Sequence, residues 1–508
     1  MSGSVRVFAD YAGDVFDSCD AVVVGSGPGG AVVAHRLATA GKDVVLIEEG
    51  PPFTPEDFVV DGAISMARTM REGGLRATRG FVMPTMQANA LGGGSLVNSA
   101  ICVRSPESTL AAWAENYELG RTGRADLDPH YQAVEDFLGI APTPDEVQGP
   151  RNLLFREGCR ALGWSSEPIA RSVVGCRGSG ECFTGCRARA KQSTDISYVP
   201  SAIHAGARVL TSARVERLLT WGRRRATGVE GVIVRPFTGE VTHRFRVDAK
   251  VVVLAAGCMA TPVLLQRSGA LADASGQVGR NLQFHPGVAI LGIFPDRTEP
   301  QFGATQGYQS LHFVPEGFKM ETLWAPPGVF AVRLPGFGLD YKANLARIPF
   351  CAVFDSISSC NRSLGTVRAR RSGLDPVLHW TLHHEDLKIL GKAMWAMAQV
   401  FFAAGATSIL PGVHGLPDEM HSAAEAEVLR THDYRPTDLT CSGNHVFSTT
   451  RMHGDPRRGV VGEDGRCHDF DNLYIADTGI LPRSPSVNPM LTLMALAHRM
   501  GGELAARL

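Results

Sequence analysis

Residues 21–49 read AVVVGSGPGGAVVAHRLATAGKDVVLIEE, and this stretch decides the fold. Two apolar runs, 21–24 and 44–47, flank an alanine-rich segment whose apolar residues have helical spacing. Glycines stand where the first run ends and the helical segment begins. The pattern predicts a strand, a tight turn, a helix and a second strand, with the strands parallel.

The glycines and the acid in this stretch predict a dinucleotide site. Gly25 allows the turn, Gly27 lets the backbone approach a pyrophosphate, and Gly30 lets the helix pack closely on the sheet. The phosphates are expected at the positive helix N-terminus. Glu48 ends the second strand, where a carboxylate accepts hydrogen bonds from ribose hydroxyls and repels a 2′-phosphate. FAD or NAD is therefore expected rather than NADP, and a glycine-rich turn without a ligand is the alternative.

Composition excludes several classes of protein. The 508 residues suffice for two or three cores, and 44% hydrophobic with 20% charged residues is ordinary for a globular protein. Lys+Arg 50 against Asp+Glu 51 leaves a net charge of −1, so no nucleic-acid partner is expected. No run is long enough for an intrinsic membrane segment, and the first residues lack the pattern of a secretory signal. Eleven cysteines, an odd number, do not form a disulfide framework, so a cytoplasmic location is predicted.

A second glycine-rich segment, 90–104, reads ALGGGSLVNSAICVR. Its three glycines expose backbone N–H groups beside the polar side chains of Ser95 and Asn98, which suits a polar or anionic ligand. A plain flexible loop is the alternative. Further on, the apolar run 251–255 predicts a central parallel strand, and a helix is expected around 386–404.

The C-terminal stretch is dense in motifs. Residues 473–476 predict a short buried strand that ends at Asp477, and a helix is expected from Pro489 with Asn488 near its cap. His445 precedes the predicted strand and is expected in a loop.

Taken together, these motifs resemble the glucose–methanol–choline (GMC) oxidoreductases, FAD-dependent enzymes that oxidise alcohols. The resemblance covers most of the chain and lies in GSGPGG with Glu48, LGGGSLVN, GCMATPVLLQRSG, VGRNLQFHP, His445, NLYIADTGILP and VNP. It implies an α/β fold in which a Rossmann-like FAD-binding domain is interleaved with a mixed-sheet α+β substrate domain. The FAD domain would comprise 15–110, 195–290 and 440–508, the connecting Cys-rich region 111–194, and the substrate domain 291–439.

The resemblance also assigns residues. Val215 would meet the adenine through its backbone, and Asp477 would border the ribityl chain. The residues expected around FAD are Gly25, Gly27, Pro28, Gly29, Gly30, Glu48, Glu49, Gly92, Gly93, Gly94, Ser95, Asn98, Val215, Ala256, Asp477, Asn488, Pro489 and Met490.

The resemblance implies His445 and Asn488 as the catalytic pair. Flavin takes a hydride from the alcohol carbon, so the protein must manage the hydroxyl proton. His445 is expected to act as the base, because the unperturbed pKa of histidine, about 6.5, lies near working pH. Asn488 would orient the hydroxyl without competing for the proton. A buried structural histidine and a simple helix cap are the alternatives. The expected partners are a small-molecule alcohol and oxygen or another electron acceptor.

Three cysteines, Cys176, Cys182 and Cys186, form a C-x5-C-x3-C cluster among glycines. Some GMC-type dehydrogenases carry a similar stretch that binds an iron–sulfur cluster and passes electrons to a cytochrome, whereas long-chain alcohol oxidases have one with no cluster assigned. Structural thiols are the preferred interpretation here, and iron–sulfur ligands are the alternative.

Two other functions fit the same resemblance. A sterol-type 3-hydroxy oxidase or dehydrogenase would also need a carboxylate base for isomerisation, which the sequence does not assign. A flavin-dependent lyase or decarboxylase would take no net hydride from an alcohol.

Overall fold

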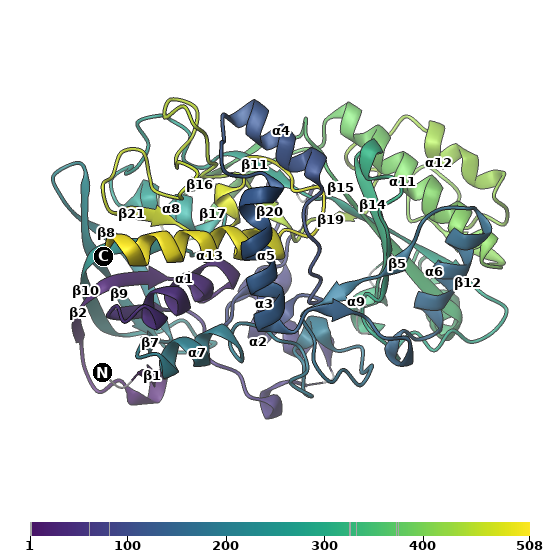
Figure 1. Cartoon of the computed structure of the whole chain (residues 1–508). Coiled ribbons are helices and arrows are strands. Elements are labelled where there is room, and N and C mark those ends of the chain that lie inside the picture. The colour runs from purple at the N-terminus through teal and green to yellow at the C-terminus, as the bar shows by residue number, and fades with distance from the viewer. Residues whose placement is uncertain are drawn as a thin grey trace.

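The predicted strand, turn, helix and strand form as β2 (Val15–Val24), α1 (Pro28–Thr39) and β3 (Val44–Ile47), with the two strands parallel. The structure is a computed structural model that describes residues 3–59, 61–80, 82–324, 327–331, 333–371, 373 and 375–508. In Figure 1 this unit lies at the left, and a second sheet with its own helices lies at the right.

The first sheet is built around β2. Its strand order is β1-β7-β3-β2-β10-β9-β8, and β21 lies beside β10. The apolar end of β10 runs parallel between β2 and β21 and is fully buried, as expected for a central strand. The remaining bounds are β1 (Ser4–Arg6), β7 (Arg208–Leu210), β8 (Ala213–Trp221), β9 (Arg225–Val234), β10 (Val241–Leu254) and β21 (Leu473–Ile475).

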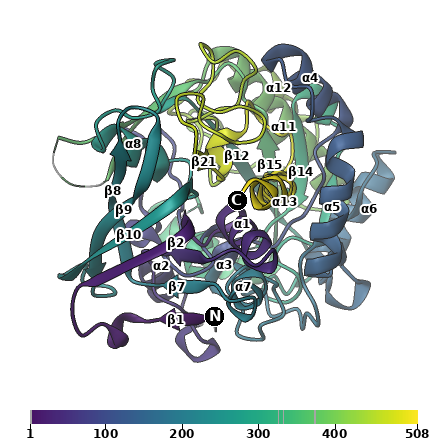
Figure 2. The same ribbon diagram turned by 60° about the vertical axis from the view of Figure 1, so that its left-hand side comes forward.

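Helix α1 is held between this sheet and α13 (Met490–Arg507), the predicted C-terminal helix. Figures 1 and 2 both show the two helices side by side. The approach of α1 is close, because a Cβ atom on Gly29 would lie 1.8 Å from the carbonyl oxygen of Ala476, and one on Gly30 would lie 2.0 Å from that of Gly25. Beyond this layer lie α4 (Glu107–Tyr117), α5 (Arg124–Leu138) and α7 (Tyr198–His204).

The second sheet has the order β18-β12-β15-β14-β13-β5, with β19 beside β12. The predicted amphipathic helix is α11 (His384–Ala403), which packs its apolar side on this sheet, with the ring of Phe401 stacked 3.8 Å from that of Phe354. Around it lie α6 (Pro150–Ala161) and α12 (Val428–Thr431). The strands are β5 (Glu167–Pro168), β12 (Gly287–Ile293), β13 (Tyr308–Ser310), β14 (Phe318–Thr322), β15 (Cys351–Ser358), β18 (Ser408–Leu410) and β19 (Cys441–Ser442).

A smaller sheet, in the order β17-β16-β11-β20, connects the two halves. Its strands are β11 (Arg280–Phe284), β16 (Gly365–Ala369), β17 (Pro376–His379) and β20 (Val446–Phe447), and α8 (Ala260–Arg267) packs on β16. The interleaved Rossmann-like and mixed-sheet architecture is therefore present. The domain boundaries stay a prediction, since β12 and β19 lie across or beyond the expected limits at 290 and 440.

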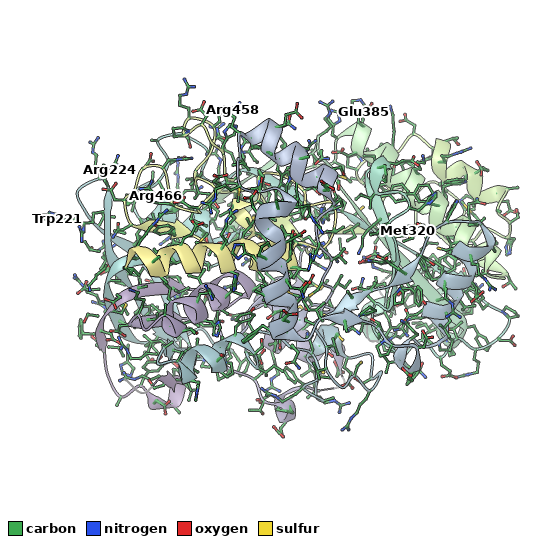
Figure 3. The ribbon with its side chains drawn as sticks, viewed as in Figure 1. Trp221, Arg224, Met320, Glu385, Arg458 and Arg466 are labelled. Atoms are coloured by element: carbon green, nitrogen blue, oxygen red, sulfur yellow. The ribbon has the colours of Figure 1, made fainter. Side chains whose placement is uncertain are left out.

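The other α-helices and strands are α2 (Gly62–Thr69), α3 (Gly94–Val97), α9 (Pro327–Ala331), α10 (Leu339–Ala346), β4 (Ala141–Pro142) and β6 (Ala170–Arg171). Among the described residues, no helix combines the length and the apolar character needed to cross a membrane. Trp221 and Arg224 lie at the tip of the β8–β9 hairpin, and Figure 3 shows both side chains directed away from the protein.

Candidate active site

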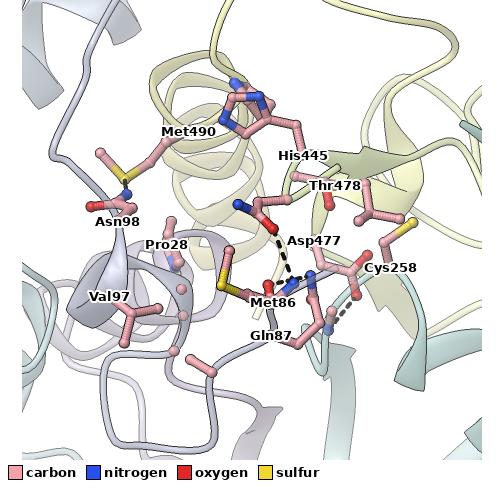
Figure 4. Close-up of a pocket in the computed structure, with 18 of the residues that line it drawn as sticks. Pro28, Met86, Gln87, Val97, Asn98, Cys258, His445, Asp477, Thr478 and Met490 are labelled. Atoms are coloured by element: carbon pink, nitrogen blue, oxygen red, sulfur yellow. Dashed lines mark hydrogen bonds between the residues drawn. The ribbon is translucent and has the colours of Figure 1, made fainter. Parts of the chain in front are cut away.

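A cavity of about 450 Å³ lies between the two large sheets and collects nearly all of the predicted site residues. Figure 4 shows part of its wall, with His445 and Asp477 on one side and Pro28 and Asn98 on the other. The predicted residues that line it are Gly25, Gly27, Pro28, Gly29, Glu48, Glu49, Gly93, Gly94, Asn98, Val215, Ala256, His445, Asp477, Asn488, Pro489 and Met490.

Three predicted site residues do not line the cavity. Gly30 is used for close packing of α1 on the sheet. The N–H of Gly92 donates to the Ser26 hydroxyl at 2.9 Å, and the Ser95 hydroxyl donates to the Gly92 carbonyl at 2.6 Å. Gly92 therefore joins the second glycine loop to the first, and Ser95 holds Gly92 from within the second loop, so neither residue faces the cavity.

The two glycine loops meet at the N-terminus of α1. Gly25 has a φ of +106°, and a Cβ atom on Gly93 would lie 2.8 Å from the Cα atom of Gly27. The positive φ of Gly25 and the close approach of Gly93 to Gly27 both require glycine, so main-chain atoms form the cavity wall at this point. The N–H groups of Gly25 and Gly93 donate to the carbonyls of Ile47 and Ala90 at 2.7 and 2.9 Å. The N–H groups of the first turn of α1, which have no partner within the helix, are therefore the ones that suit a pyrophosphate.

Glu48 lines the cavity but is already well satisfied by the protein. Its carboxylate accepts hydrogen bonds from the N–H and hydroxyl of Ser26 at 3.0 and 2.7 Å and from the N–H of Gly50 at 2.9 Å. Burial raises the pKa of Glu48, against the effect of these donors. A carboxylate offers about four acceptor positions, so one remains for a ribose hydroxyl. Its neighbour Glu49 pairs instead with Arg71 at 2.8 Å.

Asp477 lies two residues after the end of β21, close to the strand end that the sequence predicts, and holds two loops of the first sheet together. Its carboxylate accepts hydrogen bonds from the Thr261 hydroxyl at 2.5 Å and from the N–H groups of Gly257 and Gly479 at 3.1 and 2.8 Å. Burial raises the pKa of Asp477 to about 6 despite these donors. The Asp477 carboxylate therefore fixes the backbone of Gly257 and Gly479 at the cavity wall, and a polar ligand placed beside it can shift its protonation.

Asn98 lies at the end of α3, opposite the start of α13. Its amide nitrogen lies 3.1 Å from the Met490 sulfur, and its carbonyl accepts from the N–H of Ala100 at 2.9 Å. Figure 4 shows Asn98 and Met490 directed toward one another. These contacts bring the second glycine loop against the C-terminal helix at the cavity.

His445 lies half-buried in the cavity wall, opposite a second histidine, His285. Their Nδ1 atoms are 3.3 Å apart. Burial, with a smaller effect of the Lys319 ammonium, lowers the pKa of His445 to about 3. The expectation of a pKa near working pH is therefore wrong: the imidazole is neutral over the whole physiological range because desolvation disfavours its cation.

Asn488 is buried and is oriented by a lysine. The ammonium group of Lys319 donates to Asn488 Oδ1 at 2.7 Å and to Gln309 Oε1 at 2.6 Å, and it pairs with Glu321 at 2.8 Å. Because the Asn488 carbonyl is engaged, its NH₂ group is left to donate toward the cavity. The alternative of a helix cap is wrong, since the cap residue of α13 is Pro489 and no side chain caps that helix.

The sheet that carries Lys319 also presents two carboxyl groups to the cavity. Glu321 on β14 lies directly opposite Asp355 on β15, so both side chains share one face of the sheet. Burial and the nearby Glu321 raise the pKa of Asp355 to about 8, so Asp355 is a neutral acid at pH 7. Arg333 also lines the cavity and donates to the Ser442 hydroxyl at 3.0 Å.

The three clustered cysteines lie around a separate small cavity. In the part of the chain that the structure describes, no group of three or more His, Cys, Asp or Glu residues is arranged to hold a metal ion. Cys182 instead accepts a hydrogen bond from Arg171 at 2.9 Å. Burial alone would raise the pKa of Cys182, but Arg171 and Lys191 outweigh it and lower the pKa.

Sequence reasoning missed Lys319, Glu321, Asp355, Arg333 and His285. The first four lie in the region 291–439, where strands carry no recognisable motif. A lysine and a glutamate two apart in FKMET look like the solvent face of a strand. His285 was available as a signal, because it stands in the quoted motif VGRNLQFHP.

Comparison with known proteins agrees with this geometry. Residues 59–287 match the N-terminal and residues 361–497 the C-terminal family model described as GMC oxidoreductase, and residues 20–89 match an FAD binding domain. An uncharacterised GMC-type oxidoreductase of Mycobacterium tuberculosis is 34% identical over 96% of this chain and 76% of its own. The chain belongs to the GMC oxidoreductase family.

Other GMC relatives have named activities or solved structures. A long-chain-alcohol oxidase of Arabidopsis thaliana is 26% identical over 96% of this chain and 68% of its own. The crystal structure of pyridoxine 4-oxidase from Mesorbium loti has a TM-score of 0.72 at 21% identity and covers 96% of this chain and 99% of its own. The predicted GMC fold and the FAD cofactor are thus confirmed, and the protein is an FAD-dependent oxidoreductase.

Proposed function

We propose that this GMC oxidoreductase oxidises the CH–OH group of an alcohol to an aldehyde or ketone. The observation that carries the proposal is the complementary pair in the cavity: His445, a neutral acceptor, and Asn488, whose carbonyl is held by Lys319 so that its NH₂ is the free donor. A hydroxyl group both donates and accepts a hydrogen bond, so it satisfies both residues at once. The named activity of the long-chain-alcohol oxidase relative supports the same class of donor.

The residues divide the work as follows. Gly25, Gly27 and Gly93 would hold the pyrophosphate of FAD, and Glu48 its ribose. When bound, FAD supplies the acceptor for the hydride that leaves the alcohol carbon. Asn488 donates to the alcohol oxygen, and His445 accepts the hydroxyl proton as the carbonyl forms.

The depressed pKa of His445 has a chemical consequence. A neutral imidazole is available at every pH above its pKa of about 3, so no activation by deprotonation is needed. The protonated form is a strong acid and passes the proton on readily. The same low pKa makes the imidazole a weaker base, so acceptance of the proton depends strongly on its exact placement beside the hydroxyl.

Anaerobic mixing of the purified enzyme with candidate alcohols tests the proposal. Loss of the oxidised flavin absorbance in the dark, with one carbonyl formed per flavin, is the expected result. A substrate that turns over without bleaching the flavin would establish the lyase or decarboxylase alternative instead. Reoxidation by oxygen, compared with reoxidation by an artificial acceptor, identifies the class of electron acceptor.

A second candidate, the sterol-type 3-hydroxy oxidase, is favoured by one specific observation. That reaction needs a carboxylate base in the cavity, and Glu321 lies in the wall beside Lys319 with Asp355 opposite. The discriminating measurement is the ultraviolet spectrum of the product from a 3-hydroxy-5-ene sterol. A conjugated enone band supports this candidate, and absence of any product from sterols rejects it.

A further inference from the structure

His285 and His445 are brought together by strand pairing rather than by sequence proximity. In the antiparallel pair β11 and β20, Gln283 lies opposite Phe447 and Phe284 opposite Val446. One step further along the same register, His285 lies opposite His445, and the N–H of His285 donates to the carbonyl of His445 at 3.2 Å. The two imidazoles therefore sit on paired backbone that fixes their separation.

A serine determines where the protons of this pair reside. The Ser484 hydroxyl donates its only hydrogen to Ser359 Oγ at 3.0 Å and accepts from the N–H of Ser486 at 3.1 Å. It also lies 2.6 Å from His285 Nε2. With its hydrogen directed at Ser359 Oγ, the Ser484 hydroxyl can only accept from His285, which assigns the proton of this contact to His285 Nε2.

The protonation of His285 determines which ring nitrogen of His445 carries the proton. Neutral His285 with a proton on Nε2 has a lone pair on Nδ1. The Nδ1 atom of His445 lies 3.3 Å away, so it is the atom that donates. The cationic form of His285 is disfavoured, because burial first, and then His445 and Lys319, lower its pKa well below the ordinary value.

We infer that His285 is a positioning residue that, through Ser484, holds His445 in the tautomer with Nδ1 protonated and Nε2 unprotonated. Among the described residues, His445 Nε2 has no hydrogen-bond partner, and the side chain borders the cavity. Nε2 is then the atom that accepts the substrate proton. This inference rests on the proposed function and adds which nitrogen acts and what fixes it. The other tautomer would present an N–H to the hydroxyl and could not take its proton.

Nitrogen NMR of the holoenzyme with ¹⁵N-labelled histidine tests the tautomer without measuring turnover. His445→Gln assigns the signals of His445, and His285→Phe those of His285. We expect a protonated Nδ1 and an unprotonated Nε2 for His445, with the opposite pattern for His285. A protonated Nε2 on His445, or a cationic His445, at neutral pH would overturn the inference.

Two variants test the role of the network. Ser484→Ala removes the acceptor of the His285 proton, so the His445 signals should report a mixture of tautomers. The kcat should fall by about 10- to 100-fold, the scale on which such outer partners act, with KM changed far less. Ser484→Thr, which keeps a hydroxyl, should restore the single tautomer and most of the turnover.

The outcomes separate the inference from the function it rests on. Unchanged His445 signals in Ser484→Ala would refute the part assigned to His285 and Ser484, whatever the rate. A correct tautomer in an enzyme that never reduces its flavin with any alcohol would instead refute the proposed function. Flavin absorbance of each variant confirms that the holoenzyme has formed before either result is used.

Discussion

Replacement of Lys319 by methionine tests the buried network most directly. The Lys319 side chain is 0% exposed and that of Glu321 is 4% exposed. The ammonium group donates hydrogen bonds to Gln309 and Asn488 and forms an ion pair with the carboxylate of Glu321. Methionine fills similar space without charge or donors, so Lys319→Met leaves a buried carboxylate without its cation and frees the Asn488 amide to rotate.

The expected loss of stability follows from the burial of the pair. Removing one partner of a buried ion pair costs about 3–5 kcal/mol, and solvent screening gives no relief at these exposures. The entropy of unfolding of a chain of 508 residues is about 1 kcal/mol/K near 60 °C. The melting temperature should therefore fall by about 3–5 °C. Lys319→Met with Glu321→Gln removes both charges and should recover most of that loss.

The assay is thermal unfolding followed by circular dichroism at a fixed concentration of FAD, because a bound cofactor itself shifts the midpoint. Lys388→Met is the matched control: Lys388 is 71% exposed and pairs with Glu385, so its midpoint should move by less than about 1 °C. In the double variant kcat should stay about 10-fold or more below wild type, since Asn488 is no longer oriented. An unchanged midpoint and an unchanged kcat in Lys319→Met would refute the reasoning.

Three further predictions concern the cavity. His445→Ala should lower kcat by about two to four orders of magnitude with flavin still bound, and wild-type turnover of this variant would contradict the role of His445 as base. In the wild-type enzyme, the pH profile of kcat should show no inflection from His445 between pH 5 and 8, because its pKa is about 3. Glu48→Ala should release FAD on dialysis, read from flavin absorbance, because Ser26 and Gly50 lose their acceptor; full retention would count against the ribose role. The pKa of Asp355 is raised to about 8, so its carboxyl group is neutral below that pH and ionised above it. The KM should therefore change near pH 8 in the wild type and stay constant there in Asp355→Asn. Identical pH profiles of KM for the two enzymes would reject this prediction.

Local patterns predicted individual elements well, because each of these features lies within a few residues of chain, whereas the interleaved architecture was implied only by the resemblance to the GMC family. The turn at Gly25, the burial of 251–254 and the amphipathic α11 each follow from neighbouring side chains. The boundaries between the FAD domain and the substrate domain were harder to predict from the sequence. Pairing of β19 with β12 joins positions 441–442 to 287–288, and such long-range register leaves no local trace.

The site shows the same division. The sequence pattern itself predicted a dinucleotide such as FAD, the two glycine loops and Glu48, since these stand in contiguous motifs. The resemblance to the GMC family added the role of Asp477 and the pair His445 and Asn488. Only the tertiary structure decided the protonation and orientation of that pair. The neutral state of His445 follows from desolvation, and the direction of the Asn488 amide follows from a lysine on a strand 169 residues earlier. Burial and long-range pairing set the energies of polar groups, and neither is a property of a residue and its chain neighbours.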